Sequence, residues 1–285
     1  MTSTPPNRPL SFTGVVAGLV LCFALQGLVA FGLGWKATKT ESNYFSSLIR
    51  FQAAASGPAE LTVVGSSITG RLPGREMGNP DVANLGTDGG SSADGLRLLC
   101  DGRMRTGKWV ILETNTFLRV VLDPPSTMLD SVGGAAFRAG AGVPALGYSA
   151  RPTGMLYGKL LNRKAGGGEV QVFPLAADAA PVAEAPVAGQ EATRYAGLVD
   201  MIGQLQAKGC RVLLVEYPSE PMAPEVRAMT DRGVAYVTAR TRVPFLDLAR
   251  QIPRDRLTFT DTVHLSPGSA RDVLESLRNF LVTQP

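Results

Sequence analysis

Short apolar runs alternate with amphipathic stretches along most of the chain. Five runs have the length of buried strands, and they lie at 61–64, 81–85, 109–112, 212–215 and 243–248. Apolar residues at helical spacing predict helices over 92–100, 191–208 and 221–232, and a last helix that begins at Pro267. Strands alternating with helices predict a parallel sheet with helices on both sides. The strands are short and almost wholly apolar, as expected of strands buried on both faces.

Composition agrees with one α/β domain plus extra segments. Of 285 residues, 45% are hydrophobic and 18% are charged, which allows a sizeable core and excludes global disorder. The net charge is +4, and the positive residues are scattered among few aromatic residues. This pattern lacks the basic, aromatic-interleaved patch of nucleic-acid binders, so no nucleic-acid partner is expected.

The N-terminal region has the pattern of a membrane anchor. No charged residue lies between Arg8 and Lys36, and 12–35 is long enough to cross a bilayer, which takes about 20 residues. No convincing cleavage site follows, so an uncleaved anchor is favoured over a cleaved signal peptide. We expect a short tail at 1–11, and a juxtamembrane helix and linker at 36–59. The charges that flank the span do not decide its orientation. A short N-terminal tail before a first hydrophobic segment usually stays in the cytoplasm, so we expect a single-pass inner-membrane protein with its domain in the periplasm.

The main domain, expected over 60–285, contains two interruptions. Residues 132–164 are rich in Gly, Ala and Arg, and 175–190 form a low-complexity stretch. Together they predict an insertion at about 132–190 between the third strand and its return helix. Two readings stay open: a lid or partner surface at the active edge, or a tolerated surface loop.

Two cysteines lie in the main domain, each just before a predicted strand. Cys100 and Cys210 could form a disulfide if neighbouring strand starts bring them together, or they could be two separate buried thiols. Both alternatives stay open. The cysteine spacing matches no metal site, and neither a metal nor a cofactor is expected.

One histidine stands out as the chain's only imidazole. His264 lies three residues after Asp261, while far upstream the apolar run ends in Gly65-Ser66-Ser67. A serine on a sharp turn after a strand is how a hydrolase exposes a nucleophile, and a histidine with an acid partner removes its proton. Ser67 is favoured over Ser66, because adjacent residues at a strand end point to opposite faces.

Four segments, in order, resemble the four blocks of the SGNH (GDSL-like) hydrolase family. They are Gly65-Ser66-Ser67-Ile68-Thr69, Asn84-Leu85-Gly86-Thr87-Asp88-Gly89-Gly90, Glu113-Thr114-Asn115-Thr116 and Asp261-Thr262-Val263-His264. The resemblance covers roughly 60–283 outside the insertion. Each block is weak alone, but each follows the correct predicted strand. The resemblance implies a flavodoxin-like three-layer sandwich around the five-stranded parallel sheet, preceded here by the transmembrane helix.

The family's functional residues carry over position by position. The nucleophile falls on Ser67, and the Asp-x-x-His pair on Asp261 and His264. The second-block glycine falls on Gly89 and the third-block asparagine on Asn115. The resemblance implies an oxyanion hole made by the backbone amides of Ser67 and Gly89 and the side-chain amide of Asn115.

Two blocks depart from the family pattern. Ser66 replaces the aspartate of Gly-Asp-Ser, and the third block begins with Glu113 instead of reading Gly-x-Asn-Asp. The residues supporting the catalytic set therefore differ. The Gly-Ser-Ser form behind a membrane anchor resembles the envelope branch of the family, which acts in O-acetylation of exopolysaccharides such as alginate or cellulose and in teichoic acid D-alanylation.

The expected function is therefore that of a membrane-anchored serine esterase or O-acyltransferase. It would transfer acetyl groups to or from a cell-envelope or extracellular polysaccharide, with a membrane acyltransferase or polysaccharide synthase as partner. One alternative is a lipid or small-ester hydrolase with the same triad. Another is a non-catalytic scaffold of the same fold in a polysaccharide synthesis or export complex.

Overall fold

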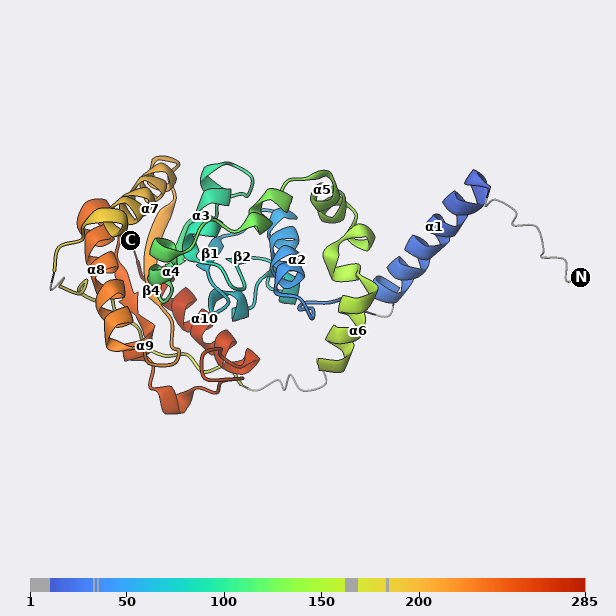
Figure 1. Ribbon diagram of the computed structural model, residues 1–285. Helices are drawn as coiled ribbons and strands as arrows, with labels where there is room; N and C mark the ends of the chain where they lie inside the picture. The colour runs from blue at the N-terminus through green and yellow to red at the C-terminus, as the bar shows by residue number, and fades with distance from the viewer. Residues whose placement is uncertain (1–10, 33, 35, 162–168, 183–184, 285) are drawn as a thin grey trace, which may run out of the picture.

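A sheet of five parallel strands forms the centre of the computed structural model (Figure 1). The strand order is β2-β1-β3-β4-β5. The strands are β1 Leu61–Gly65, β2 Val82–Gly86, β3 Trp109–Glu113, β4 Arg211–Glu216 and β5 Phe245–Asp247. The α/β class and the parallel sheet expected from the alternating pattern are confirmed, with strand ends shifted by a few residues.

The structure describes residues 11–32, 34, 36–161, 169–182 and 185–284. The expected tail at 1–11 therefore lies outside the described residues except for Ser11, and so do parts of the expected anchor and insertion.

The helices of the domain agree with the sequence pattern in most places. They are α2 Asn43–Ala55, α3 Ser92–Cys100, α4 Phe117–Leu122, α5 Ala135–Gly142, α6 Pro152–Leu161, α7 Gly189–Ala207, α8 Pro224–Thr241, α9 Leu248–Gln251 and α10 Pro267–Val282. The expected end of the 221–232 helix is wrong, because α8 continues well beyond it. Gly233 does not stop α8; it lies inside the helix, where the rings of Tyr195 and Phe117 leave no room for a side chain.

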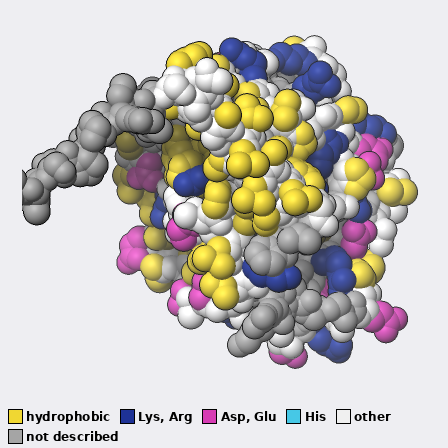
Figure 2. Space-filling model, turned by 90° about the vertical axis from the view of Figure 1, so that its right-hand side faces the viewer, with side chains coloured by type: hydrophobic (Ala, Val, Ile, Leu, Met, Phe, Trp, Pro, Cys, Tyr) yellow, Lys and Arg dark blue, Asp and Glu magenta, His cyan; other side chains and the backbone are white. Residues whose placement is uncertain are grey.

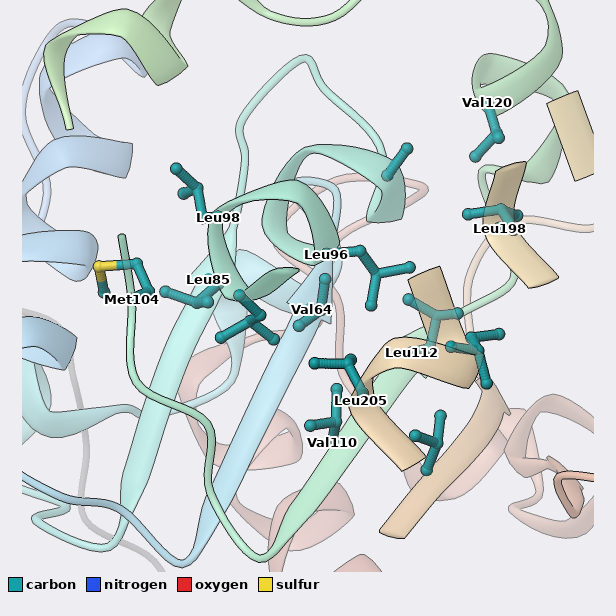
Figure 3. Packing of buried hydrophobic residues seen from close by; sticks show 14 of the residues in the cluster. Val64, Leu85, Leu96, Leu98, Met104, Val110, Leu112, Val120, Leu198 and Leu205 are labelled. Carbon is teal, nitrogen blue, oxygen red and sulfur yellow. The ribbon is translucent and has the colours of Figure 1, made fainter. Parts of the chain in front are cut away.

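Apolar side chains pack on both faces of the sheet. Val64 and Leu112 point to the face covered by α2, α3, α7 and α8 (Figure 3). Their strand neighbours Val63 and Ile111 point to the opposite face, which α9 and α10 cover. This alternation is the two-residue period of a strand, and it explains why these strands are apolar at every position.

Helix α2 belongs to this core, although it lies in the segment expected to be a juxtamembrane helix and linker, 36–59. Leu48 and Phe51 are fully buried in the larger apolar cluster, against the residues of β2. The folded unit therefore begins before residue 60. The amphipathic spacing of α2 is visible in the sequence, but its packing partner is not.

The N-terminal helix projects away from the domain (Figure 1). It comprises α1 Phe12–Gly27 and a π-helical turn, Leu28–Gly32, and it is long and apolar enough to span a membrane. Its side chains are largely exposed. Figure 2 views the molecule from this side and shows hydrophobic side chains gathered on it.

The first part of the insertion packs beside the base of this helix. The side-chain amide of Gln26 donates to the Ala145 carbonyl at 3.0 Å, and the Ala37 amide donates to the Ser149 carbonyl at 2.8 Å. The second part runs alongside α10, where the Gln171 amide donates to Asp272 Oδ1 and the Phe173 amide to Ser276 Oγ. It then reaches the sheet, where the Asp178 amide donates to the Phe245 carbonyl of β5 at 3.0 Å. The described parts of the insertion therefore bond to the N-terminal apolar helix and the segment after it, and to the edge strand β5.

Cys100 and Cys210 are free thiols. Cys210 is buried, and the Cys100 thiol lies 3.5 Å from the Met201 carbonyl. The structure therefore has two separate thiols and no disulfide between Cys100 and Cys210. Burial raises the pKa of the Cys100 thiol, which keeps it protonated and unreactive near neutral pH.

We predict that Phe51→Ala lowers the free energy of unfolding by about 3–5 kcal/mol, because it opens a cavity in the core under β2. Urea denaturation of the full chain in detergent measures the change. The control is Leu122→Ala, which removes an exposed apolar side chain at the end of α4 and should change stability little. Equal stability of the two variants would contradict a core role for α2.

Candidate active site

The candidate nucleophile lies on a tight turn directly after β1. The Gly70 amide donates to the Ser66 carbonyl at 3.0 Å, which closes the turn around Ser67. Glycine is required at position 65, because a Cβ there would overlap the side chains of Thr69 and Glu113. The turn therefore exposes Ser67 at the carboxyl edge of the sheet, where open α/β folds bind ligands.

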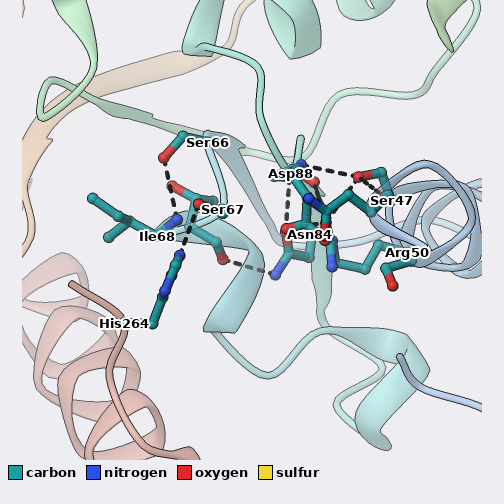
Figure 4. A network of polar contacts seen from close by, with 12 residues as sticks. Ser47, Arg50, Ser66, Ser67, Ile68, Asn84, Asp88 and His264 are labelled. Carbon is teal, nitrogen blue, oxygen red and sulfur yellow. Dashed lines mark hydrogen bonds and ion pairs between the residues drawn. The ribbon is translucent and has the colours of Figure 1, made fainter. Parts of the chain in front are cut away.

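Ser67, His264 and Asp261 form one hydrogen-bonded chain. The Nε2 atom of His264 lies 2.8 Å from Ser67 Oγ, and its Nδ1 atom lies 2.8 Å from Asp261 Oδ2. Figure 4 shows the imidazole of His264 pointing at Ser67 from the loop before α10. An acceptor at Nδ1 favours the tautomer with its proton there, which leaves Nε2 free to accept the serine proton.

Local hydrogen bonds hold the acid in place. Asp261 Oδ1 accepts the backbone amides of Val263 at 2.8 Å and of His264 at 2.7 Å. Partial burial raises the pKa of Asp261, but the bonds from the His264 ring and from these two amides outweigh burial and hold it well below its usual range. The carboxylate therefore stays ionised over the working pH range and can stabilise an imidazolium.

A short antiparallel bridge closes the loop that carries this pair. Phe259 pairs with Leu265, and the Thr260 amide donates to the His264 carbonyl at 2.9 Å. Ser266 then caps α10, since its side chain accepts the Ser269 amide. The loop is therefore fixed at both ends, although half of the Asp261 side chain is exposed.

Two of the three expected oxyanion donors are unoccupied. Within the part of the chain that the structure describes, the backbone amides of Ser67 and Gly89 have no hydrogen-bond partner. Gly89 has φ +81°, a conformation that glycine adopts without strain. Both amides are therefore available to an anionic oxygen.

Helix α2 holds the loop that carries Gly89. The Arg50 guanidinium donates twice to the Gly86 carbonyl, at 3.0 and 2.8 Å, and pairs with Asp88 at 3.0 Å. The Asp88 amide donates to Ser47 Oγ at 2.9 Å (Figure 4). Sequence reasoning missed Arg50, because it lay in the expected juxtamembrane segment.

Asn115, the third expected oxyanion donor, joins the ends of β3 and β4. Its Nδ2 group donates to the Tyr217 carbonyl at 2.8 Å and to Ser219 Oγ at 3.2 Å, and its Oδ1 accepts the Tyr217 amide at 2.7 Å. Both amide protons are engaged within the protein. An oxyanion role for Asn115 therefore stays a prediction, and it requires the longer bond to Ser219 to give way when substrate binds.

The fully buried carboxylate of Glu113 organises this site, and it was not among the site residues predicted from the sequence. Its Oε2 accepts the backbone amides of Ser66 and Thr69 and the Thr69 hydroxyl, at 2.9, 3.1 and 2.6 Å. Its Oε1 accepts the hydroxyls of Ser66 and Thr116, at 2.7 and 3.0 Å. Because Ser66 Oγ is buried and bonded to Glu113, it is not placed to act as the nucleophile.

The carboxylate that supports the turn at Ser66 enters from Glu113 on the neighbouring strand β3. Ser66 and Glu113 are two positions at which the sequence differs from the blocks that it resembles, and these differences were the signal available in the sequence. Only the pairing of β1 with β3 gives that signal a physical meaning.

In the described residues, no group of three or more His, Cys, Asp and Glu side chains is placed to hold a metal ion. Comparisons with protein-family models, curated proteins and solved structures found no match.

We predict that Glu113→Ala lowers the free energy of unfolding by about 2–6 kcal/mol, because two buried backbone amides lose their acceptor at about 1–3 kcal/mol each. Glu113→Gln should cost less, since its amide oxygen can still accept both N–H groups. Urea denaturation gives the stability, and fluorophosphonate labelling of Ser67 reports the turn.

The matched control is Glu216→Gln, which alters another buried carboxyl one strand away, at β4. It should leave labelling of Ser67 near wild type. If Glu113→Ala were folded, as stable as wild type and labelled equally fast, Glu113 would have no positioning role.

Proposed function

We propose that this protein is an SGNH-type serine hydrolase or O-acyltransferase anchored in a membrane. The observation that carries the proposal is the hydrogen-bonded chain from Ser67 through His264 to Asp261, with 2.8 Å at each step. The backbone amides of Ser67 and Gly89, which have no hydrogen-bond partner in the described part of the chain, add to it. The strand order β2-β1-β3-β4-β5 supports the finer expectation of a flavodoxin-like three-layer sandwich.

The geometry supports acyl transfer in two steps. In the first, Ser67 Oγ attacks the ester carbonyl carbon while His264 Nε2 takes the hydroxyl proton, and the oxyanion binds the amides of Ser67 and Gly89. The C–O bond to the leaving alcohol breaks as the imidazolium returns its proton to that alcohol. In the second, water or a sugar hydroxyl gives its proton to the imidazole and attacks the acyl carbon. The bond from that carbon to Ser67 Oγ then breaks as the imidazolium returns the proton to Ser67.

The proposed acyl group is acetyl, and the proposed substrate is a cell-envelope or extracellular polysaccharide. Both follow from the resemblance to the envelope branch of the family. The same triad would serve a lipid or small-ester hydrolase. A non-catalytic scaffold is less favoured, because a scaffold has no need of an aligned base and of unoccupied amides beside Ser67.

The proposed location is the periplasmic face of the inner membrane, with 12–35 as the single span. An exposed apolar helix that projects from the domain supports an anchor. A membrane acyltransferase or polysaccharide synthase that supplies or accepts the acyl group is the proposed partner.

The triad makes a direct prediction for labelling and turnover. A fluorophosphonate should modify Ser67 in the full chain in detergent, and Ser67→Ala should abolish labelling. His264→Ala should lower turnover of p-nitrophenyl acetate about 10²–10⁴-fold, because no other imidazole is present in the chain. Asp261→Asn should be less severe, since it keeps the shape of the acid but loses its charge.

The control for this experiment is Ser56→Ala, which changes an exposed serine at the end of α2 and should leave labelling unchanged. Circular dichroism checks that each variant is folded. Labelling at another serine, or near-normal turnover by His264→Ala, would reject the triad. A wild-type chain that neither reacts nor turns over any ester would favour the scaffold alternative.

The proposed topology predicts where a C-terminal reporter is active. A reporter that works only in the periplasm, fused after the last residue, should be active, and a reporter that works only in the cytoplasm should not. The physical reason is that Phe12–Gly32 is long and apolar enough to span a membrane, and this would place the whole α/β domain on one side of it. The opposite result would place the domain in the cytoplasm.

A further inference from the structure

A small charged cavity lies next to the triad loop. Its volume is about 130 Å³. The walls come from the segment after the anchor, from α2, from the turn after Ser67 and from both flanks of His264. The polar and charged side chains that line the cavity include those of Lys39, Arg50, Arg71, Glu76, Asp88 and Thr260.

Two of its cations lack an anionic partner. No hydrogen bond or ion pair involves the side chain of Lys39 or Arg71 in the described structure, and the Arg71 Nε atom is buried without a hydrogen-bond acceptor. Burial lowers the pKa of Lys39, and the nearby charge of Arg71 lowers it further. This environment disfavours a second positive charge, so a bound anion would stabilise both residues.

Neither acid of the cavity forms a salt bridge with Lys39 or Arg71 among the described residues, although the Asp88 charge raises the pKa of Lys39 and so offsets part of the lowering. Asp88 is already paired with Arg50 at 3.0 Å. Burial raises the pKa of Glu76, so that carboxyl holds a proton more readily and repels an anion less. Each acid also has one buried oxygen without a hydrogen-bond partner, Oδ2 of Asp88 and Oε2 of Glu76.

We propose that this cavity is a subsite for an acidic sugar residue of the ester substrate. Lys39 and Arg71 would bind its carboxylate or phosphate group, and Asp88 and Glu76 would accept hydrogen bonds from its hydroxyl groups. The unpartnered donors and acceptors around one small cavity match a ligand that carries both an anion and hydroxyl groups. The inference deepens the proposed function, because it names the substrate class of that site.

The position of the cavity favours a substrate group over a lipid headgroup. Arg71 lies on the 3₁₀ turn Thr69–Arg71 that follows Ser67, and Thr260 and Leu265 come from the loop that carries the triad. The Asp261 carboxylate is among the charges that act on Lys39. A sugar residue held here would therefore lie next to the reacting ester.

The test measures binding without requiring turnover. Isothermal titration of trigalacturonate into the full-length Ser67→Ala chain in neutral detergent should show binding, and cellotriose should bind much more weakly. Lys39→Gln and Arg71→Gln should each weaken trigalacturonate binding about tenfold, since each removes a charged hydrogen bond. Lys39→Arg and Arg71→Lys should retain most of it. Inorganic phosphate should compete if the subsite also accepts phosphate-bearing sugars.

A turnover arm uses the active chain with acetylated trigalacturonate and acetylated cellotriose. The ratio of kcat/KM for the acidic ester to that for the neutral ester should fall about tenfold in Lys39→Gln and in Arg71→Gln. The control is Arg105→Ala, which removes an exposed cation before β3, at the opposite edge of the sheet, and should leave the ratio unchanged.

The outcomes separate the two proposals. Turnover of esters without any preference for trigalacturonate would overturn the subsite and leave the hydrolase proposal intact. Binding of trigalacturonate through Lys39 and Arg71 without turnover of any ester would support the subsite and reject the hydrolase. If the glutamine variants lost binding to phosphatidylglycerol vesicles but kept trigalacturonate binding, the cavity would be a lipid site and the proposal would be wrong.

Discussion

The buried carboxylate of Glu113 is the interaction on which the candidate site depends. It enters from β3 and accepts five hydrogen bonds, four of them from the turn that follows β1. A carboxylate has only acceptors, so it can serve these converging donors without a clash of protons. Removing it would leave the amides of Ser66 and Thr69 without acceptors beneath the proposed nucleophile.

The contact between Glu113 and the turn after β1 lies where successive strands switch from one side of β1 to the other. After β1 the chain builds β2 on one side, and it then returns to place β3 on the other side of β1. The connections therefore diverge above the carboxyl ends of β1 and β3, and a crevice forms there in open parallel sheets. Ser67 follows one of these strands and Asn115 follows the other, while His264 reaches the crevice from the loop before α10.

The segment after the N-terminal apolar helix connects that helix to this crevice. Helix α2 is buried in the core, and its Arg50 holds the loop that presents Gly89. Lys39, between the anchor and α2, lines a cavity together with Arg71 from the nucleophile turn. The segment from Lys36 to the end of α2 therefore does two things: it packs into the core, and it contributes a positive charge to the cavity next to the triad loop.

The sequence by itself determined what depends on local pattern. Apolar runs predicted all five strands, and the spacing of Asp261 and His264 sufficed for their pairing, because three residues of one loop can bond each other directly. Tertiary structure decided what depends on contacts between distant segments. Ser67 and His264 meet across 197 positions, Glu113 supports the turn from another strand, and Asn115 turns toward Tyr217. Such contacts follow from strand order and register, which no local pattern encodes.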